Sequence, residues 1–526
     1  MTRPTHGAVA APQAAASEAA IAAYRDGGNA MDAALAAALS LTVVYPNNCA
    51  LGGDLIALVH RAGRPTVEIN ASGPSARATD PDAVRARHAE MPVHGTDPIT
   101  VPGLVAGLHA VWSEGGRRPW ADAFAPAVAQ AREGVAVPPS LAHALQGDAA
   151  LLAADPGMRE VFLGDDGAVL GPGGALRQPA LARSLELLAD GGPDALYRGE
   201  LGASLLAFLR AQGSVLDAED LAGFAPERGA PLSFALGEDE LLTSRPNTQG
   251  FLLALLLGAL EHVDPALDPL GPQAASLARI AAATLEDRRR HLCDPRFTPV
   301  PLDVLLGEDH LREVARRAAA GDAPAGGGEP GPRPRGDTVA IVTADGEGNA
   351  VCLIQSLFHA FGSGLMDPAT GIICHNRGAY FTLDRGSPNR LEPSKRPAHT
   401  LMPSMLLRDG RPVLVLGTMG GSGQAQILAH VHLHLRRGLG LQEALHAPRW
   451  VVGGAGAGQP ADVVLAEGRV PATARASLAT TGLPVTALDD FDAQVGHAQA
   501  IRIEPGGTLT PASDPRSEGA ALVSGP

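Results

Sequence analysis

Aromatic residues are scarce in this chain, making up 3% of its 526 residues. Alanine and glycine are abundant instead, so helices and sheets are expected to pack closely through small side chains. Hydrophobic residues account for 45% of the sequence, which is ample for a globular fold. At this length we expect two lobes or one large layered domain.

Basic residues are also in deficit, with 41 Lys and Arg against 56 Asp and Glu and a net charge of −15. No basic stripe is present, which argues against nucleic acid and anionic membranes as partners. The longest apolar run, Ala33 to Val44, is too short to cross a bilayer, which needs about 20 residues. The N-terminal segment lacks the pattern of a secretory signal, so we expect a cytoplasmic protein.

Cysteine is rare and scattered. The four cysteines form no CxxC pair, which favours a reduced compartment and no metal site. No cofactor is expected. The cysteines are Cys49, Cys293, Cys352 and Cys374.

Apolar periodicity divides the chain into a helix-rich first part, which also supplies a hairpin, and a sheet-rich second part. Helices are predicted at 14–25, 30–44, 104–112, 120–133, 181–190, 201–212, 251–260, 274–290, 311–320 and 425–437. Strands or hairpins are predicted at 55–60, 66–70, 338–344, 350–356, 371–376, 404–416 and 498–509. Helices flanking antiparallel strands indicate a layered α+β sandwich.

Three alternate histidines, His430, His432 and His434, lie in the predicted helix at 425–437. Alternate positions do not share one helix face, so these side chains are expected to be partly exposed and to bind no metal.

The sequence changes character at Thr338. Residues 323–336 are a Pro/Gly-rich loop, and the β-branched, apolar strand that follows begins at Thr338. If the chain were cut before Thr338, its α-amine would lie beside its own hydroxyl and could take the hydroxyl proton. The simpler interpretation is a Thr that opens a β-hairpin.

A nucleophile of this kind needs donors for the tetrahedral oxyanion. The run Thr418-Met-Gly-Gly-Ser-Gly423 follows a predicted strand and precedes a helix, so its backbone N–H groups could serve. An ordinary strand-to-helix turn, or a generic anion-binding nest, is the alternative.

Together these motifs resemble the γ-glutamyltransferase family, in the family's order and nearly end to end. In the second part the resemblance rests on Thr338 to Ala350, Ser356, Phe361 to Gly364, Gly371-Ile372, Asn376, Lys395 to Pro397, Gly420 to Ser422 and Ser513 to Arg516. In the first part it rests on Glu18 to Ala34, Leu51 to Gly53, Pro102-Gly103 and Tyr197 to Gly199.

The resemblance implies a four-layer αββα fold of the N-terminal-nucleophile hydrolases and a precursor that cuts itself between Asp337 and Thr338. Residues 1–337 would form the large subunit and residues 338–526 the small one, intertwined in one domain. By position, Thr338 is the expected nucleophile, Ser356 the hydroxyl that orients it, and Gly420 with Gly421 the oxyanion hole.

The chain departs from the family where the substrate is bound. Asn70 stands in place of an Arg that holds the substrate α-carboxylate, and Arg377 and Tyr380 replace residues that hold its α-amine. The expected substrate-binding residues are Asn70, Phe358, Arg377, Tyr380, His399 and Thr400. A free Arg377 would repel an ammonium and attract a carboxylate; a surface ion pair is the alternative for this residue.

The sequence therefore predicts an autoprocessed amidohydrolase or acyltransferase that cleaves an amide through a threonyl acyl-enzyme, with water or an amine as acceptor. Plain γ-glutamyltransferase (glutathione hydrolase) activity is one reading. A divergent acylase acting on oxamate-like, glutaryl or cephalosporin side chains is another. An unprocessed, non-enzymatic homologue is the third. Whether the protein forms a homo-oligomer is left open.

Overall fold

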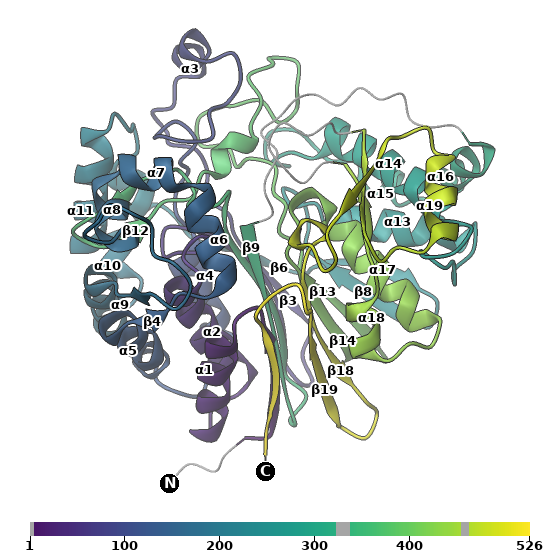
Figure 1. Cartoon of the computed structure of the whole chain (residues 1–526), viewed down its shortest axis with the longest axis horizontal. Helices are drawn as coiled ribbons and strands as arrows, with labels where there is room; N and C mark the ends of the chain where they lie inside the picture. The colour runs from purple at the N-terminus through teal and green to yellow at the C-terminus, as the bar shows by residue number, and fades with distance from the viewer. Residues whose placement is uncertain (1–4, 322–336, 454–461, 526) are drawn as a thin grey trace.

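Two β-sheets pack face to face at the centre of the computed structural model, which describes residues 5–321, 337–453 and 462–525 (Figure 1). The first sheet has the order β20-β1-β9-β10-β2-β3-β6. Its strands are β20 (Ala520–Ser524), β1 (Gly7–Ala11), β9 (Asp337–Asp345), β10 (Ala350–Phe358), β2 (Asp54–His60), β3 (Val67–Ala71) and β6 (Glu227–Gly229). Both parts of the chain thus contribute strands to it.

The second sheet has the order β19-β18-β14-β13-β8-β7. Its strands are β19 (Leu509–Ser513), β18 (Ala498–Ile503), β14 (Arg411–Thr418), β13 (Ser404–Arg408), β8 (Asp239–Thr243) and β7 (Leu232–Leu236). Alternate side chains of both sheets, such as Ala340, Ile354 and Val415, form one buried cluster between them.

A helix layer covers the outer face of each sheet, giving four αββα layers (Figure 1). On the first sheet lie α1 (Ala14–Arg25), α2 (Ala30–Val44), α4 (Leu104–Ser113), α5 (Ala125–Glu133), α9 (Pro179–Gly191) and α11 (Glu200–Ala211). On the second lie α13 (Phe251–Glu261), α14 (Ala274–His291), α16 (Glu308–Ala320), α17 (Gln424–Arg436), α18 (Leu441–His446) and α19 (Ala472–Ala479). The four-layer prediction is confirmed.

The shorter elements lie around these layers. The helical ones are α3 (Pro81–Arg87), η1 (Trp120–Phe124), α6 (Pro139–Gly147), α7 (Ala149–Ala154), α8 (Pro156–Phe162), α10 (Asp194–Tyr197), α12 (Ala218–Ala222), α15 (Leu302–Leu305), η2 (Arg377–Tyr380), η3 (Gly421–Gly423) and η4 (Ala493–Val495). The strands are β4 (Val135–Ala136), β5 (Ala175–Leu176), β11 (Met366–Asp367), β12 (Ile372–Ile373), β15 (Trp450–Val452), β16 (Val464–Glu467) and β17 (Val485–Leu488).

Helix α2 shows how small side chains serve this architecture. Every residue of α2 is buried, between α1 and the first sheet, because its many alanines allow close approach on all sides. Asn29 caps the helix by accepting from the N–H groups of Met31 and Asp32, and Asp32 bonds back to the Asn29 N–H.

Several strands were not predicted, among them β1, β20, β7 and β8. β1 and β20 pair with each other along their whole length, and β1 also pairs with β9. β7 and β8 form a hairpin within a region that was expected to be mostly helical. Short apolar segments such as Gly7–Ala11 have no period of their own, so tertiary pairing decides their structure.

The expectation that the three histidines of α17 are partly exposed is wrong. His430, His432 and His434 are all buried, because α17 is packed between the second sheet and neighbouring helices. His430 lies edge-on against Trp450, with ring centres 4.7 Å apart. Burial lowers the pKa of His432 to about 3 and of His434 to about 4, and holds that of His430 well below its usual value.

These buried neutral histidines predict a loss of stability in acid. In the unfolded chain each would protonate near pH 6.5, so stability is complete above that pH and is lost as the pH falls toward 4. Each proton taken up on unfolding adds about 1.4 kcal/mol per pH unit to the slope. Urea unfolding between pH 7 and 4 measures this slope, and His430→Phe, which keeps the ring contact, should reduce it by one proton's share. An unchanged slope in His430→Phe would contradict the assignment.

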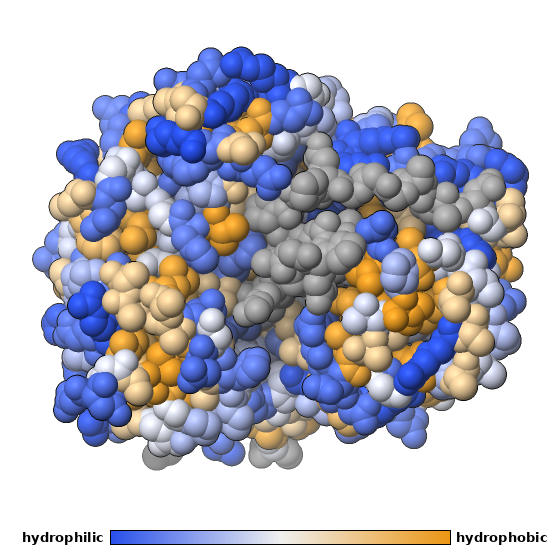
Figure 2. Space-filling view, turned by 45° about the horizontal axis from the view of Figure 1, so that its top comes forward, coloured by the Kyte–Doolittle hydropathy of each residue, from blue (hydrophilic) through white to orange (hydrophobic). Residues whose placement is uncertain are grey.

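On the face drawn in Figure 2, hydrophilic residues dominate the upper rim, and hydrophobic residues gather in smaller groups lower down on both sides. Within the three described ranges, no helix is both long and apolar enough to cross a membrane.

Candidate active site at the start of strand β9

Thr338 lies at the beginning of β9, beside two other polar residues in the same position on neighbouring strands. The strand register pairs Thr338 with Ser356 on β10, and Ser356 with Asp54 on β2. The residues two positions further inward on these strands, including Ala340 and Ile354, belong to the core between the sheets. The polar row therefore closes one end of that core, and all three residues are buried.

The Thr338 hydroxyl donates to the Ser356 hydroxyl over 3.1 Å. The Ser356 oxygen also accepts from the backbone N–H of Phe358, over 2.7 Å. A β-bulge follows Ser356, and Phe358 has a φ of 81°, a left-handed conformation that is strained for a bulky residue. The chain changes direction at this bulge. The Ser356 hydroxyl bonds to Thr338 on one side and to the backbone N–H of Phe358 on the other.

Replacing Ser356 with Ala should slow both self-cleavage and amide hydrolysis, by about 100-fold, because Thr338 loses its orienting partner. Ser356→Thr keeps a hydroxyl at this position and should stay within a few-fold of wild type. Single-turnover rates on an anilide, and the rate at which the full-length band disappears, give the two values. Equal rates in wild type and Ser356→Ala would rule out the orienting role.

The turn at Gly420 and Gly421 lies at the same end of the core. A Cβ on Gly417 would lie 3.1 Å from the Ala340 side chain, so β14 faces β9 just before the turn. Gly420 has a φ of 142°, and a Cβ there would lie 2.2 Å from Ile427, so only glycine fits. Within the described residues, neither Gly420 nor Gly421 has an acceptor for its N–H. The turn can therefore offer two donors.

Gln249 fixes this turn. Its side-chain amide donates to the carbonyls of Gly421 and Thr400, over 2.8 and 2.9 Å. The turn at Gly420 and Gly421 and the segment that carries Thr400 are thereby held together. Sequence analysis missed Gln249, because a lone Gln before an apolar helix gives no signal of its own.

Arg377 is fully buried and forms a two-point ion pair with Asp54. Its Nε and Nη2 donate to the two carboxylate oxygens over 2.8 and 3.1 Å. Its Nη1 donates to the Thr400 hydroxyl over 3.2 Å, and its Cζ lies 4.3 Å from the Phe358 ring centre. The donors that sequence analysis reserved for a substrate carboxylate are thus occupied by Asp54, and the pair is not on the surface.

His399 completes this cluster. Its Nε2 donates to Asp54 over 2.8 Å, while its Nδ1 accepts from the Leu401 N–H. Burial lowers the pKa of His399 to about 4, with Arg377 acting in the same direction, so the ring is neutral near pH 7. Burial alone would raise the pKa of Asp54, but Arg377 and His399 hold it far below its usual range.

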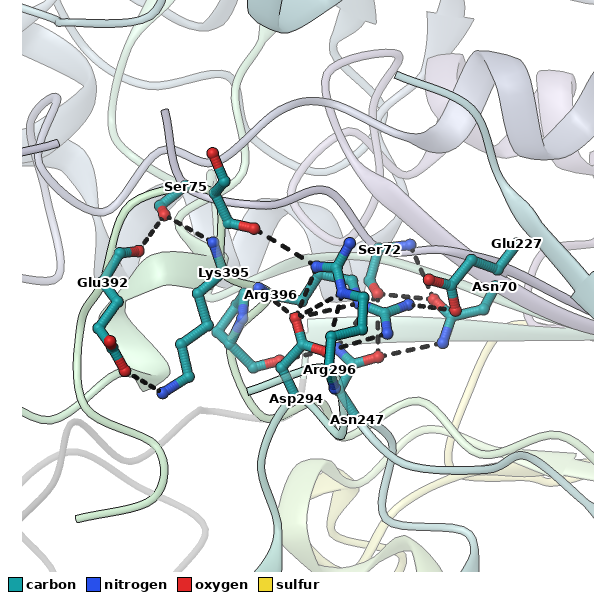
Figure 3. A network of polar contacts seen from close by, with 12 residues as sticks. Asn70, Ser72, Ser75, Glu227, Asn247, Asp294, Arg296, Glu392, Lys395 and Arg396 are labelled. Carbon is teal, nitrogen blue, oxygen red and sulfur yellow. Dashed lines mark hydrogen bonds and ion pairs between the residues drawn. The ribbon is translucent and has the colours of Figure 1, made fainter. Parts of the chain in front are cut away.

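Asn70 lies on β3, opposite Ile56. Its side chain is occupied on both sides: it donates to Asn247 over 3.1 Å and accepts from the Ser72 hydroxyl over 2.6 Å (Figure 3). Tyr380, on η2, lies edge-on against Phe358 with ring centres 5.3 Å apart. Of the predicted substrate-binding residues, Phe358, Arg377, Tyr380, His399 and Thr400 form one cluster. Asn70 lies beside it, in a polar network that Asn247 joins to the His399 backbone.

The Lys395-Arg396-Pro397 motif anchors the segment that carries His399 and Thr400. Arg396 pairs with the buried Asp294, which follows α14, and Lys395 pairs with Glu392 (Figure 3). The Arg396–Asp294 pair ties the end of α14 to the segment that carries His399 and Thr400, and the Lys395–Glu392 pair braces that segment internally, so the motif positions it.

The Asp514-Pro-Arg516 motif has a similar structural role. Arg449, Asp514, Arg516 and Glu467 form a buried network of ion pairs with distances from 2.7 to 3.0 Å. It joins the end of β19 to β16 and to the residue before β15.

Asp54 is the other residue that sequence analysis overlooked, although it lies at the centre of the cluster. A carboxylate directly before the apolar run Leu55 to Val59 was the available signal, because such a group needs a buried partner. In the part of the chain that the structure describes, no group of three or more His, Cys, Asp or Glu residues could hold a metal ion.

The chain is similar to known proteins over nearly its whole length. The profile of the gamma-glutamyltranspeptidase family matches residues 16–524. The chain is 37% identical to an oxamate amidohydrolase proenzyme of Klebsiella pneumoniae and 35% identical to a glutathione hydrolase-like proenzyme of Bacillus subtilis, with 98% of each chain covered in both cases. A crystal structure of cephalosporin acylase from Bacillus halodurans superposes with a TM-score of 0.88 at 30% identity, covering 99% of this chain and 96% of that one.

Proposed function

Because the chain belongs to the gamma-glutamyltranspeptidase family and is an amide-hydrolysing enzyme of that kind, we propose that Thr338 is its nucleophile and that the precursor cuts itself at Asp337–Thr338. The observation that carries this proposal is the buried Thr338–Ser356 hydroxyl pair at the start of a core strand. The cut would divide the chain into residues 1–337 and 338–526, large and small fragments that remain partners.

Self-cleavage begins when the Thr338 oxygen attacks the carbonyl of Asp337. The peptide nitrogen leaves as the α-amine of Thr338, and an ester joins the two fragments until water hydrolyses it. The new amine then lies beside the hydroxyl that it must deprotonate.

Turnover repeats the same chemistry on a substrate. The Thr338 oxygen attacks the amide carbonyl while its proton passes to the α-amine, and the oxyanion is stabilised by the N–H groups of Gly420 and Gly421. The substrate amine leaves with that proton, and a threonyl ester remains. Water releases the acid, and an amine acceptor would give acyl transfer instead.

The acyl pocket favours a divergent acylase or amidohydrolase over a γ-glutamyl-specific enzyme. Asn70 cannot form the ion pair that the family makes with the substrate α-carboxylate. Arg377 stands at a position that holds the α-ammonium in the family, and because it is paired with Asp54 it offers an ammonium no acceptor. Similarity to an oxamate amidohydrolase supports short acid amides as substrates. Glutathione hydrolysis is the second candidate, supported by the similarity to a glutathione hydrolase-like proenzyme.

Mass spectrometry of the purified protein tests the assignment. The smaller fragment should begin at Thr338, and a trapped intermediate should carry the acyl mass on Thr338. A screen of oxamate, glutaryl anilides, γ-glutamyl anilide and glutathione should show the last two as the poorer substrates. One intact band without turnover would favour the non-enzymatic homologue, and γ-glutamyl turnover at rates typical of the family would overturn the pocket assignment.

We also propose a cytoplasmic location. It is supported by the four cysteines, which are all unpaired and buried.

A further inference from the structure

Arg288, in the last turn of α14, lies at the edge of the active-site cluster. Its Cζ is 5.1 Å from the Tyr380 ring centre, and that ring meets Phe358 edge-on. The Phe358 N–H is bonded to Ser356, which accepts from Thr338. A short chain of direct contacts therefore joins the Arg288 guanidinium to the nucleophile.

No carboxylate of the described residues pairs with Arg288. The two acids just before it in the helix have other partners: Glu286 pairs with Arg290 and Asp287 with His310. The Arg288 Nε is buried and has no acceptor within the described ranges. Among the described residues, this partly buried cation thus has no carboxylate partner.

Arg288 differs from the fully buried arginines of the described residues. Each of those pairs with a buried carboxylate: Arg377 with Asp54, Arg396 with Asp294, Arg449 with Asp514, and Arg516 with Glu467. Burial without such a partner lowers the pKa of Arg288 to about 10, although the group stays charged near pH 7. An anion arriving from outside the chain would restore the missing partner.

The Tyr380 hydroxyl offers a second donor, carried by the ring that the Arg288 guanidinium contacts. It is buried and has no hydrogen-bond partner among the residues described. Phenol and guanidinium groups both donate, and a carboxylate accepts from both, in two directions at once. The contact from Asp294 to Arg396 anchors the chain just beyond α14, so the helix end that carries Arg288 is held in place.

We propose that Arg288 and the Tyr380 hydroxyl bind a carboxylate of the amide substrate, so that this enzyme selects anionic amides. The inference rests on the proposed function. It adds the charge of the substrate and the residues that bind the charged group. The carboxylate could belong to the acyl group, as in a half-amide of a dicarboxylic acid, or to the departing amine.

Matched substrate pairs separate these cases. For the acyl side, the mono-4-nitroanilides of succinic and glutaric acid are compared with their terminal primary amides, which have the same shape but no charge. For the amine side, 4-(butanoylamino)benzoate is compared with its 4-carboxamide. In wild type, the acid of one pair should exceed its neutral partner in kcat/KM by about 100-fold.

Arg288→Met should reduce that preference to about 1 while changing turnover of the neutral substrate by only a few-fold. Arg288→Lys keeps the charge and should retain part of the preference, and Tyr380→Phe should lose a smaller part. The control is Arg290→Met, an exposed arginine on the same helix, which should behave as wild type. Self-cleavage on a denaturing gel shows that each variant has folded.

Calorimetric titration with glutarate gives a reading that does not depend on turnover. Binding to wild type that is weakened at least tenfold in Arg288→Met supports the inference, even if no anilide is hydrolysed and the proposed function fails. Three results would overturn the inference. The first is a wild-type enzyme with no preference for the acid, and the second is a preference that is equal in wild type and Arg288→Met. The third is glutarate binding that is absent or unaffected by the substitution. Acylated Thr338 reports on the proposed function separately.

Discussion

A Thr338→Ala variant is expected to remain a single full-length chain and to hydrolyse no amide, with kcat at least about 10⁴-fold below wild type. The reason is that both reactions begin with the same oxygen, which the Ser356 hydroxyl holds in place at 3.1 Å. A denaturing gel measures cleavage, and anilide turnover measures catalysis.

Thr338→Ser should keep part of both reactions, because it retains the hydroxyl and, after cleavage, the neighbouring amine. Thr343→Val is a matched control: it removes a hydroxyl from the same strand, one that donates to the Ala30 carbonyl over 2.8 Å, away from the site. This variant should cleave normally. Cleavage or full activity in Thr338→Ala would refute the nucleophile assignment.

The second large effect is expected for Asp54→Asn. The substitution leaves the buried Arg377 without its counterion, and breaking a buried ion pair in this way costs about 3–5 kcal/mol of unfolding free energy. Activity should fall as well, because Arg377 packs on Phe358 and His399 depends on the same carboxylate. Urea unfolding at pH 7 measures the loss of stability.

Removing both charges tests whether the cost comes from the unpaired cation. A double variant, Asp54→Leu with Arg377→Met, should recover most of the stability lost in Asp54→Asn, without recovering activity. Asp82→Asn removes an exposed carboxylate that pairs with Arg85 and Arg385, and should change stability little. If Asp54→Asn unfolds like Asp82→Asn, the buried pair does not have this role.

Much of the fold could be predicted because many elements carry their own signals. α1 and α2 begin and end at the predicted residues, and β9 and β10 contain the strands predicted at 338–344 and 350–356. β7 and β8 were not predicted, although buried and exposed side chains alternate along β7, because they lie between segments with helical periodicity. β1 and β20 could not be identified locally, since each becomes a strand by pairing with segments hundreds of residues away.

The site was predictable where the chemistry resides in one motif and not where it depends on partners. The side chains of Thr338 and Ser356 do meet, as expected. Arg377 was identified as a site residue, but its ion pair with Asp54, 323 positions away, could not be predicted. No local sequence pattern specifies which buried charges pair with each other. Arg288 was overlooked for the same reason: only the structure shows that no described acid reaches it.

The position of β1 has a mechanical consequence for the processed enzyme. If the chain is cut at the proposed Asp337–Thr338 bond, β1 belongs to the large fragment, whereas its two hydrogen-bonded neighbours, β9 and β20, belong to the small one. The two fragments therefore share one sheet. Separating them would break the backbone hydrogen bonds of β1 to both of its neighbours, β9 and β20. A cut chain should unfold in one cooperative transition and should not dissociate on dilution. After denaturation, the two fragments would have to pair these strands again to regain activity.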